Sequence, residues 1–299
     1  MILVMCPKAR SGKGKKLWSS WLKIFDSANA EYKTVETEYS GHAFEIAREA
    51  DDTVVAAGGD GTINEVINGV MKSSREKEMG ILYCGTSPDF CRFHKIPIQP
   101  KQAAEALLKK KERLIDVAEI EYTKNGLKEN AFFGCSCNIG MGAMVAEFAN
   151  KYRKFLGDTC GTLWGVLLAV MKNKMVDVEL TIDNEKKKLP RCNHIVILKN
   201  PFIASGLKLN VDIKPDDGLG VVIAINDKNK LQLLSMLPGF YNGNIINDKT
   251  VLVRKFKSID VKPVNGMMDV EFDGDPKGML PVRVEIVSNA MKLIGVEDA

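Results

Sequence analysis

AAGGDGTINEVI, residues 56–67, places three glycines around a single aspartate, Asp60. The residues just before, 53–57 (TVVAA), form a short apolar and β-branched run that predicts a buried strand. Residues 62–71 follow with helical spacing of their apolar side chains, which are Ile63, Val66, Ile67 and Val70. A strand, a glycine-rich turn and a helix in this order are typical of a phosphate-binding turn in an α/β sheet.

Each residue type of this turn suits a phosphate. Glycines let backbone N–H groups approach the anion, and the helix start adds unpaired donors. Asp60 is itself an anion, which predicts a magnesium ion between it and the phosphate. Thr62 can cap the helix or bind a phosphate oxygen, and Asn64 and Glu65 fall in the first turn, where they can face the ligand. The alternative is a turn that only joins strand to helix.

Strands and helices alternate on both sides of the turn. The strands are expected at 2–6, 32–37, 53–57 and 80–84, and the helices at 13–28, 43–50, 62–71 and 101–111. Because the strands are apolar on both faces, they predict a parallel sheet covered by helices. We therefore expect a doubly wound parallel α/β domain over 1–115.

Other loops at the same sheet edge carry small, hydroxyl or basic residues. The loop after the first strand holds Lys8, Arg10, Ser11, Gly12, Lys13 and Gly14. Thr37 ends the second strand, and Gly85, Thr86 and Ser87 follow the fourth. The carboxyl ends of parallel strands form the ligand-binding edge, so these loops should meet there. The basic loop could instead be a solvated helix start, and it lacks Walker A spacing.

The pattern changes near Ile115, beyond which short strands dominate. They are expected at 117–122, 131–137, 176–182, 194–198, 219–225, 258–261, 270–272 and 282–286, with helical stretches at 143–172 and 228–237. We predict that 116–299 form a β-sandwich domain with helical insertions, whose C-terminal tail can return to the first domain.

The composition is that of a soluble globular protein, with 299 residues, 45% hydrophobic, 27% charged and a net charge of +4. The charge is too small for a dedicated nucleic-acid binder. The longest apolar run, 163–171 (LWGVLLAVM), is about half a membrane span, so we expect a buried helix, or else one facing lipid or a dimer partner. Seven cysteines without a CxxC pair predict reduced thiols and a cytoplasmic location.

Five segments in order resemble the diacylglycerol kinase catalytic-domain family, which includes soluble bacterial lipid kinases and relatives of sphingosine kinases. They are CPKARSGKG (6–14), GGDGTINEVINGV (58–70), GTSPDFCR (85–92), KPDDGLGVV (214–222) and FDGDP (272–276). The GGDGT segment alone would also fit NAD kinase or phosphofructokinase, and FDGDP favours the lipid-kinase branch.

The resemblance implies an ATP- and magnesium-dependent phosphotransferase that phosphorylates a lipid hydroxyl. The first candidate reaction is the conversion of diacylglycerol to phosphatidic acid. ATP would lie between an NAD-kinase-like first domain and the second domain, with Asp273 as general base. The implied nucleotide contacts are Lys8, Arg10, Ser11, Gly12, Thr37, Gly59, Asp60, Gly61, Thr62, Asn64, Glu65 and Thr86. Asp217 and the carbonyls of Lys214 and Leu219 would hold a structural magnesium ion.

The lipid partner requires an apolar surface, expected within 131–171 and 202–207, and peripheral contact with a membrane; relatives suggest a homodimer. Asp273-Gly274 can also be read as a plain hairpin turn. Two other functions stay open: a kinase of a soluble acceptor such as NAD, and a non-catalytic nucleotide- or lipid-binding relative. The latter is suggested by Cys6 and Pro88, where the family usually has asparagine.

Overall fold

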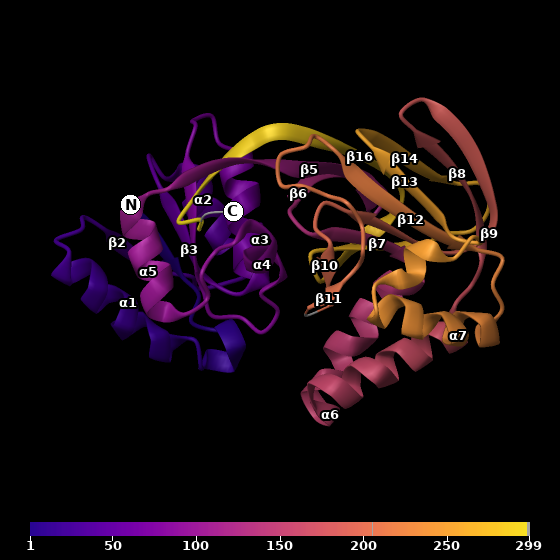
Figure 1. The fold of residues 1–299 in the computed structure, drawn as a ribbon, viewed down its shortest axis with the longest axis horizontal. Helices are drawn as coiled ribbons and strands as arrows, with labels where there is room; N and C mark the ends of the chain where they lie inside the picture. The colour runs from indigo at the N-terminus through magenta and orange to yellow at the C-terminus, as the bar shows by residue number, and fades with distance from the viewer. Residues whose placement is uncertain (205, 298–299) are drawn as a thin grey trace.

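The computed structural model describes residues 1–204 and 206–297, without the side chains of Ser11, Asp158 and Asp275. Two lobes lie side by side, the N-terminal lobe on the left of Figure 1 and the C-terminal lobe on the right. The confirmed fold class is a doubly wound α/β domain followed by a β-sandwich domain with helical insertions.

The first lobe is built on four parallel strands in the order β2-β1-β3-β4. These are β1 (Ile2–Met5), β2 (Lys33–Glu36), β3 (Val54–Gly58) and β4 (Glu78–Tyr83). Helices α1 (Lys15–Ser27) and α5 (Pro100–Lys109) pack on one face of the sheet, and α2 (His42–Glu49) and α3 (Asp60–Met71) on the other. Alternate residues of β1, β3 and β4 contribute to these two cores, which is why these three strands are apolar on both faces, whereas β2 is largely exposed.

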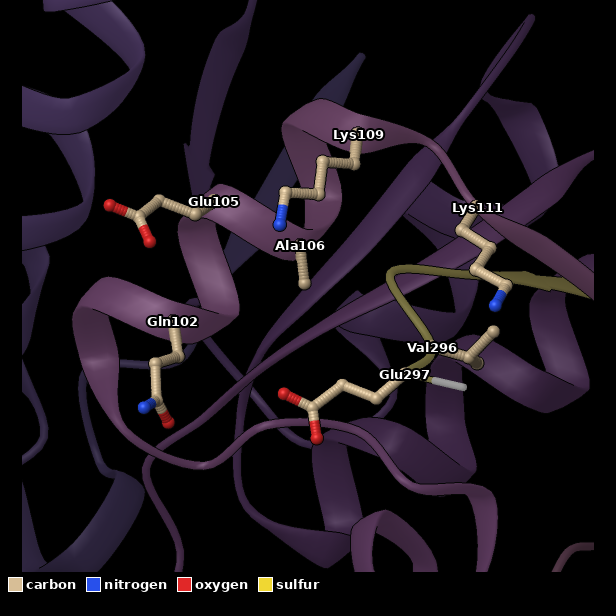
Figure 2. Close-up of a pocket in the computed structure, with 7 residues that line it drawn as sticks. All are labelled: Gln102, Glu105, Ala106, Lys109, Lys111, Val296 and Glu297. Carbon is tan, nitrogen blue, oxygen red and sulfur yellow. The ribbon is translucent and has the colours of Figure 1, made fainter. Parts of the chain in front are cut away.

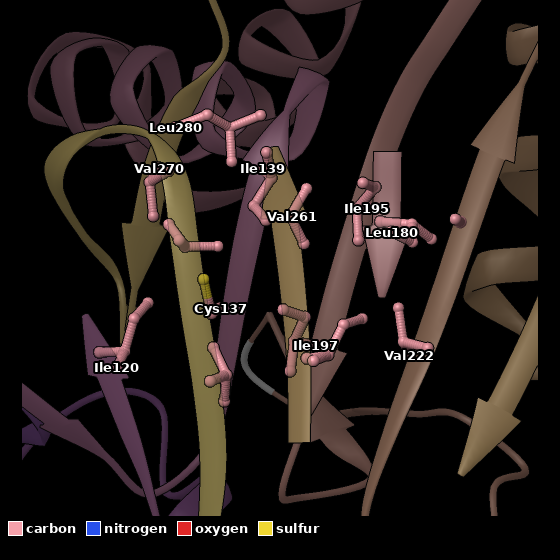
Figure 3. Close-up of a cluster of buried hydrophobic side chains, with 14 of the residues drawn as sticks. Ile120, Cys137, Ile139, Leu180, Ile195, Ile197, Val222, Val261, Val270 and Leu280 are labelled. Carbon is pink, nitrogen blue, oxygen red and sulfur yellow. The ribbon is translucent and has the colours of Figure 1, made fainter. Parts of the chain in front are cut away.

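The second lobe is a sandwich whose strand pairings close into a ring, β7-β9-β8-β14-β16-β15-β7. Its strands are β6 (Leu127–Phe133), β7 (Ser136–Gly140), β8 (Val176–Ile182), β9 (Glu185–Leu198), β12 (Gly220–Asn226), β13 (Leu252–Phe256), β14 (Ser258–Pro263) and β15 (Asp269–Phe272). Apolar side chains from facing strands fill the interior, among them Ile139, Leu180, Ile195 and Val261 (Figure 3). This interior makes the sandwich a rigid platform for the loops at its edge.

Two long strands, β5 (Glu112–Lys124) and β16 (Asp275–Ile294), run from one lobe into the other (Figure 1). In β5, Ile115 belongs to the first core and Ile120 to the second. The end of β16 pairs in parallel with β4 through Leu293 and Met79, so the C-terminal segment returns to the first sheet. The antiparallel β5–β16 ladder is therefore the covalent and hydrogen-bonded junction of the lobes.

Two sequence-based expectations fail locally. The strand predicted over 131–137 is broken at Gly134 and Cys135, because β6 ends at Phe133 and β7 begins at Ser136. The run 163–171 is not uniformly buried: Leu163, Trp164 and Met171 are 51%, 47% and 61% exposed. That face of the helix is in contact with solvent, and the expectation of burial holds only for the side that carries Ala169 and Val170.

The exposed run belongs to α6 (Met141–Lys172), which is a helical hairpin. Gly157 has non-helical dihedrals and divides it into two segments. Gly161 and Gly165 pack directly against the backbone of Arg153 and Ala149, so only glycine lets the segments approach this closely. Within the described residues, no helix is both long and apolar enough to cross a bilayer.

Candidate active site

A cleft of about 540 Å³ lies between the lobes. One end is formed by the glycine turn and by the loop after β4, with Gly59, Asp60, Gly85 and Thr86. Asp273 lies in its wall. The other end is apolar and is formed by α6, by α7 (Lys230–Tyr241) and by the small hairpin of β10 (Phe202–Ile203) and β11 (Leu207–Lys208). A polar end and an apolar end thus meet at one carboxylate.

Two glycines let the phosphate-side loops touch backbone to backbone. A Cβ on Gly59 would lie 3.2 Å from the Cα of Gly85, and one on Gly85 would lie 2.8 Å from the Cα of Gly59. Thr62 is buried, and its side chain covers Gly58 at the end of β3. Gly59 precedes the first residue of α3, and Gly59, Asp60 and Gly61 line the cleft, so the start of this helix, where N–H groups lack helical partners, lies at the cleft. The turn therefore has the form of an anion cradle.

Asp60 is a destabilised carboxylate at this cradle. Burial, together with the nearby charges of Asp89 and Asp273, raises its pKa to about 7, against the lowering effect of the hydrogen bond from the Tyr83 hydroxyl at 3.1 Å. An excess of negative charge at a phosphate site favours a cation there, so Asp60 fits a magnesium ion. Among the described residues no three acidic, histidine or cysteine side chains form a complete metal site, so phosphate oxygens and water would supply the other ligands.

Asp273 occupies the turn between β15 and β16. It and Gly274 both have positive φ, +49° and +92°, as in the two-residue hairpin turns that Asp-Gly favours. Its Oδ1 accepts the N–H groups of Cys135 and Ser136 at 3.0 and 3.2 Å. Its Oδ2 accepts Gly134 N–H and the Asn64 amide, both at 3.0 Å. The hairpin interpretation is correct, and the same turn also holds a carboxylate at the cleft.

The environment of Asp273 is suited to a base. Burial raises its pKa, and the hydrogen bonds from Gly134, Cys135, Asn64 and Ser136 offset part of that rise. The break between β6 and β7 is what presents three consecutive N–H groups, since a continuous strand would alternate them. The carboxylate is thereby fixed in orientation while its proton affinity stays above that of a free aspartate.

Comparison with known proteins agrees with this geometry. Residues 1–120 match the diacylglycerol kinase catalytic domain, and residues 135–295, more than half of the chain, match the YegS C-terminal NAD kinase beta sandwich-like domain. The chain belongs to the diacylglycerol kinase catalytic-domain family. The members of this family are lipid kinases, so family membership identifies the chain as a kinase.

Alignments with individual relatives extend over most of this chain. The diacylglycerol kinase of Bacillus subtilis (strain 168) is 28% identical over 276 residues, 89% of this chain and 86% of the relative. A crystal structure of a diacylglycerol kinase from Bacillus anthracis str. Sterne matches with TM-score 0.70 and 19% identity, covering 98% of this chain and 96% of that one. Yeast NADH kinase complexed with NADH matches at TM-score 0.60 and 9% identity, covering 99% and 83%, which shows the shared fold.

The predicted nucleotide contacts divide into two groups. Arg10, Gly59, Asp60, Gly61 and Thr86 line the cleft. Lys8, Gly12 and Thr37 lie on the loops after β1 and β2 and do not line it, and the Ser11 side chain is outside the described residues. Neither Cys6 nor Pro88, the departures from the family pattern, is a lining residue of this cleft.

Asn64 and Glu65 are engaged elsewhere. Asn64 donates to Asp273 and to the Phe132 carbonyl at 3.1 Å, so it links α3 to the second lobe. Glu65 accepts the N–H groups of Gly41 and Ala43 at 2.8 and 3.1 Å, which places its carboxylate at the start of α2. Their expected contact with nucleotide stays a prediction, and in this structure they serve as fixed supports.

The residues expected to hold the structural magnesium ion converge, but on an ammonium group. Lys199 Nζ lies 2.8 Å from Lys214 O, 3.0 Å from Leu219 O and 3.2 Å from Asp217 Oδ1. A magnesium ion at about 2.1 Å from the same oxygens would lie against that ammonium and be repelled by it. This donor set does not fit a divalent ion, which corrects the metal assignment for Lys214, Asp217 and Leu219.

Sequence reasoning missed several cleft residues. Glu271 is 2% exposed, lines the cleft and accepts the Asn138 amide at 2.6 Å. It stands two residues before Asp273 in a strand, and that same-face spacing could have indicated it. His194 also lines the cleft, where burial lowers its pKa to about 4 and keeps it neutral, so it is no phosphate-binding cation.

A smaller cavity of about 290 Å³ lies on the first lobe, under α5. Figure 2 shows Gln102 and Glu105 on the helix, with Glu297 of the C-terminal segment opposite. It shares no lining residue with the glycine turn or with Asp273. It is therefore a separate cavity from the cleft between the lobes.

Proposed function

We propose that this chain transfers the γ-phosphoryl group of ATP to the hydroxyl of a lipid, with diacylglycerol as the first acceptor to test. The observation that carries the proposal is the composition of one cleft: an anion cradle at one end, apolar walls at the other and the Asp273 carboxylate between them. The family membership supports the same reaction class.

The nucleotide end would position the triphosphate. The Gly59–Gly61 amides and the start of α3 provide donors, and Arg10 adds a positive charge at the same rim. When bound at Asp60, magnesium supplies the charge screening that phosphoryl transfer requires. The chain's own contribution is alignment, because the fixed glycine loops leave little freedom for the phosphates.

The acceptor end would hold the acyl chains. Its walls come from both segments of α6, from α7 and from the β10–β11 hairpin, and the apolar lining includes Met141, Val145, Val166, Phe202, Leu237 and Phe240. A soluble acceptor such as NAD would gain little from these side chains, whereas a diacylglycerol would bury its chains there. This composition favours a lipid over a soluble acceptor.

Asp273 would accept the proton of the acceptor hydroxyl. The three backbone N–H groups and Asn64 fix the carboxylate, and its raised pKa makes it a better base than a free aspartate. Because the phosphoryl-transfer transition state is loose, a modest base is sufficient.

An acceptor screen that measures ADP formation from ATP tests the proposal. It compares diacylglycerol and other lipids in mixed micelles with NAD and other soluble alcohols, each with and without magnesium. We expect ADP formation that depends on a lipid. Turnover with NAD and none with lipid would favour the soluble-acceptor kinase. If no acceptor of either class gives ADP formation, the result would favour a binding protein.

The tip of the α6 hairpin is the part of the chain that we propose contacts the membrane. Phe155 and Leu156 are 81% and 50% exposed beside Gly157, where the two segments meet. Lys151 and Lys154 are exposed on the turn just before them, which suits an anionic lipid surface. In Figure 1 the hairpin lies at the edge of the second lobe, away from both sheets. Its residues Met141, Val145 and Val166 line the apolar end of the cleft.

Replacing the tip side chains, Phe155→Ser with Leu156→Ser, should weaken binding to vesicles of phosphatidylcholine and phosphatidylglycerol by about 10-fold or more, because two apolar side chains no longer enter the bilayer. Vesicle sedimentation measures the effect. Leu127→Ser is the matched control, since Leu127 is 69% exposed on another element, the β5–β6 hairpin. Unchanged sedimentation with a loss of dimer in size-exclusion chromatography would instead make the tip a contact between copies.

A further inference from the structure

Lys199 is a fully buried lysine at the junction of the lobes. It follows β9 directly, and its side chain is 2% exposed. Its ammonium contacts the three oxygens described above and also Asp116 Oδ2 at 2.9 Å, in a side chain that is 0% exposed. Four oxygens within 3.2 Å of one nitrogen exceed its three hydrogens, so every donor has a partner.

The surrounding chain is organised as a cation site. Asp217 accepts the N–H groups of Lys214 and Leu219 at 3.1 and 3.2 Å, which folds the 214–219 loop around the ammonium. Asp116 accepts Gly218 N–H at 2.7 Å and Asn289 N–H at 3.0 Å. Three segments of the chain are therefore tied to one positive charge.

The position of this charge connects it with the active site. Asp116 belongs to β5, and Asn289 lies in the irregular part of β16 between Val287 and Met291, so both crossing strands are held there. Lys199 N–H also donates to the Cys135 carbonyl at 2.9 Å, and Cys135 N–H donates to Asp273. The residue whose ammonium holds the three segments therefore also binds, through its backbone, the peptide whose N–H groups hold the carboxylate of the cleft.

We propose that Lys199 is a built-in cation that replaces a structural divalent metal ion in this chain. It neutralises the Asp116 and Asp217 carboxylates, closes the 214–219 loop and acts as a positioning residue for the Asp273 support. The second lobe then needs no metal, and any magnesium requirement of the chain belongs to the nucleotide end of the cleft alone. This role of Lys199 depends on its contacts in the fold and not on which acceptor the chain phosphorylates.

Thermal melting of the intact chain, in EDTA and then in excess magnesium or calcium, tests this. The wild type should melt at the same temperature in all three solutions. Lys199→Ser leaves the buried Asp116 carboxylate and the partly buried Asp217 carboxylate without their cation and should melt about 10 °C lower in EDTA. Its smaller side chain opens the site, so magnesium or calcium should restore much of that loss.

Lys214→Met is the matched control, because Lys214 contributes its backbone carbonyl while its side chain is exposed; it should melt as the wild type does. If Lys199→Ser does not fold, metal analysis of the wild type decides: the protein is incubated with magnesium and calcium and then passed into metal-free buffer without a chelator, and the absence of a tightly held divalent ion supports the proposal. A wild type that loses stability in EDTA and regains it with magnesium would overturn it. So would a Lys199→Ser variant that melts like the wild type.

Discussion

Asp273→Asn should lower kcat by about 10²–10⁴-fold with the lipid acceptor, because the variant has no base for the hydroxyl proton. The Asn oxygen can still accept from Cys135 and Ser136, but its NH₂ group would face the donors of Gly134 and Asn64. Some loss of stability therefore accompanies the loss of rate, and both are measured, by steady-state kinetics and by thermal melting.

The control for this substitution is Asp269→Asn, at the exposed start of the same strand, which should keep the wild-type rate. ATP affinity separates catalysis from misfolding, since an intact glycine turn should bind ATP in the variant about as well as in the wild type. Full turnover in Asp273→Asn would show that another group takes the proton.

Asp60→Asn should abolish most turnover and yet stabilise the protein above neutral pH. Its carboxyl has a pKa of about 7 in the folded chain against an ordinary value of 3.8, so folding opposes its ionisation. One pKa unit is about 1.4 kcal/mol, and allowing for residual solvent access we expect a gain of about 1–3 kcal/mol at pH 8. The amide oxygen can still accept the Tyr83 hydroxyl.

The sign of this effect depends on pH. Between pH 4 and 7 the folded chain holds a proton on Asp60 that the unfolded chain has lost, so wild-type stability falls as pH rises through this window. Below pH 4 both states are protonated, and the advantage of Asp60→Asn should vanish. Denaturant unfolding at pH 4 and pH 8 measures it, and a variant no more stable than the wild type at pH 8 would contradict the account.

The pattern of apolar residues in the sequence was sufficient to predict the strands of the first lobe. Its four strands lie within two residues of the predicted ranges, and β1, β3 and β4 contain short apolar runs, whereas β2 (KTVE) is a largely exposed edge strand. In the second lobe β13 was missed, since Leu252–Phe256 is an edge strand with Arg254 and Lys255 exposed. The break at Gly134 was also missed, because a short interruption in an apolar run carries little pattern of its own.

The glycine turn was found from the sequence because local turn chemistry marks it, and Asp273 because the FDGDP segment resembles the family; the structure places both on one cleft. The partners of Glu65 and Lys199 could not be found in this way. Glu65 caps a helix that precedes it, and Lys199 meets Asp116 and Asp217 only after β5, β9 and the 214–219 loop have assembled. Contacts of this kind are set by tertiary packing and leave no periodic signal.

The most direct test of the account follows labelled phosphate from ATP into the lipid extract, with diacylglycerol in mixed micelles and magnesium present. We expect label in phosphatidic acid for the wild type and for Asp269→Asn, and nearly none for Asp273→Asn. Label that never enters a lipid, or that enters equally with Asp273→Asn, would contradict the claim that this cleft phosphorylates a lipid hydroxyl.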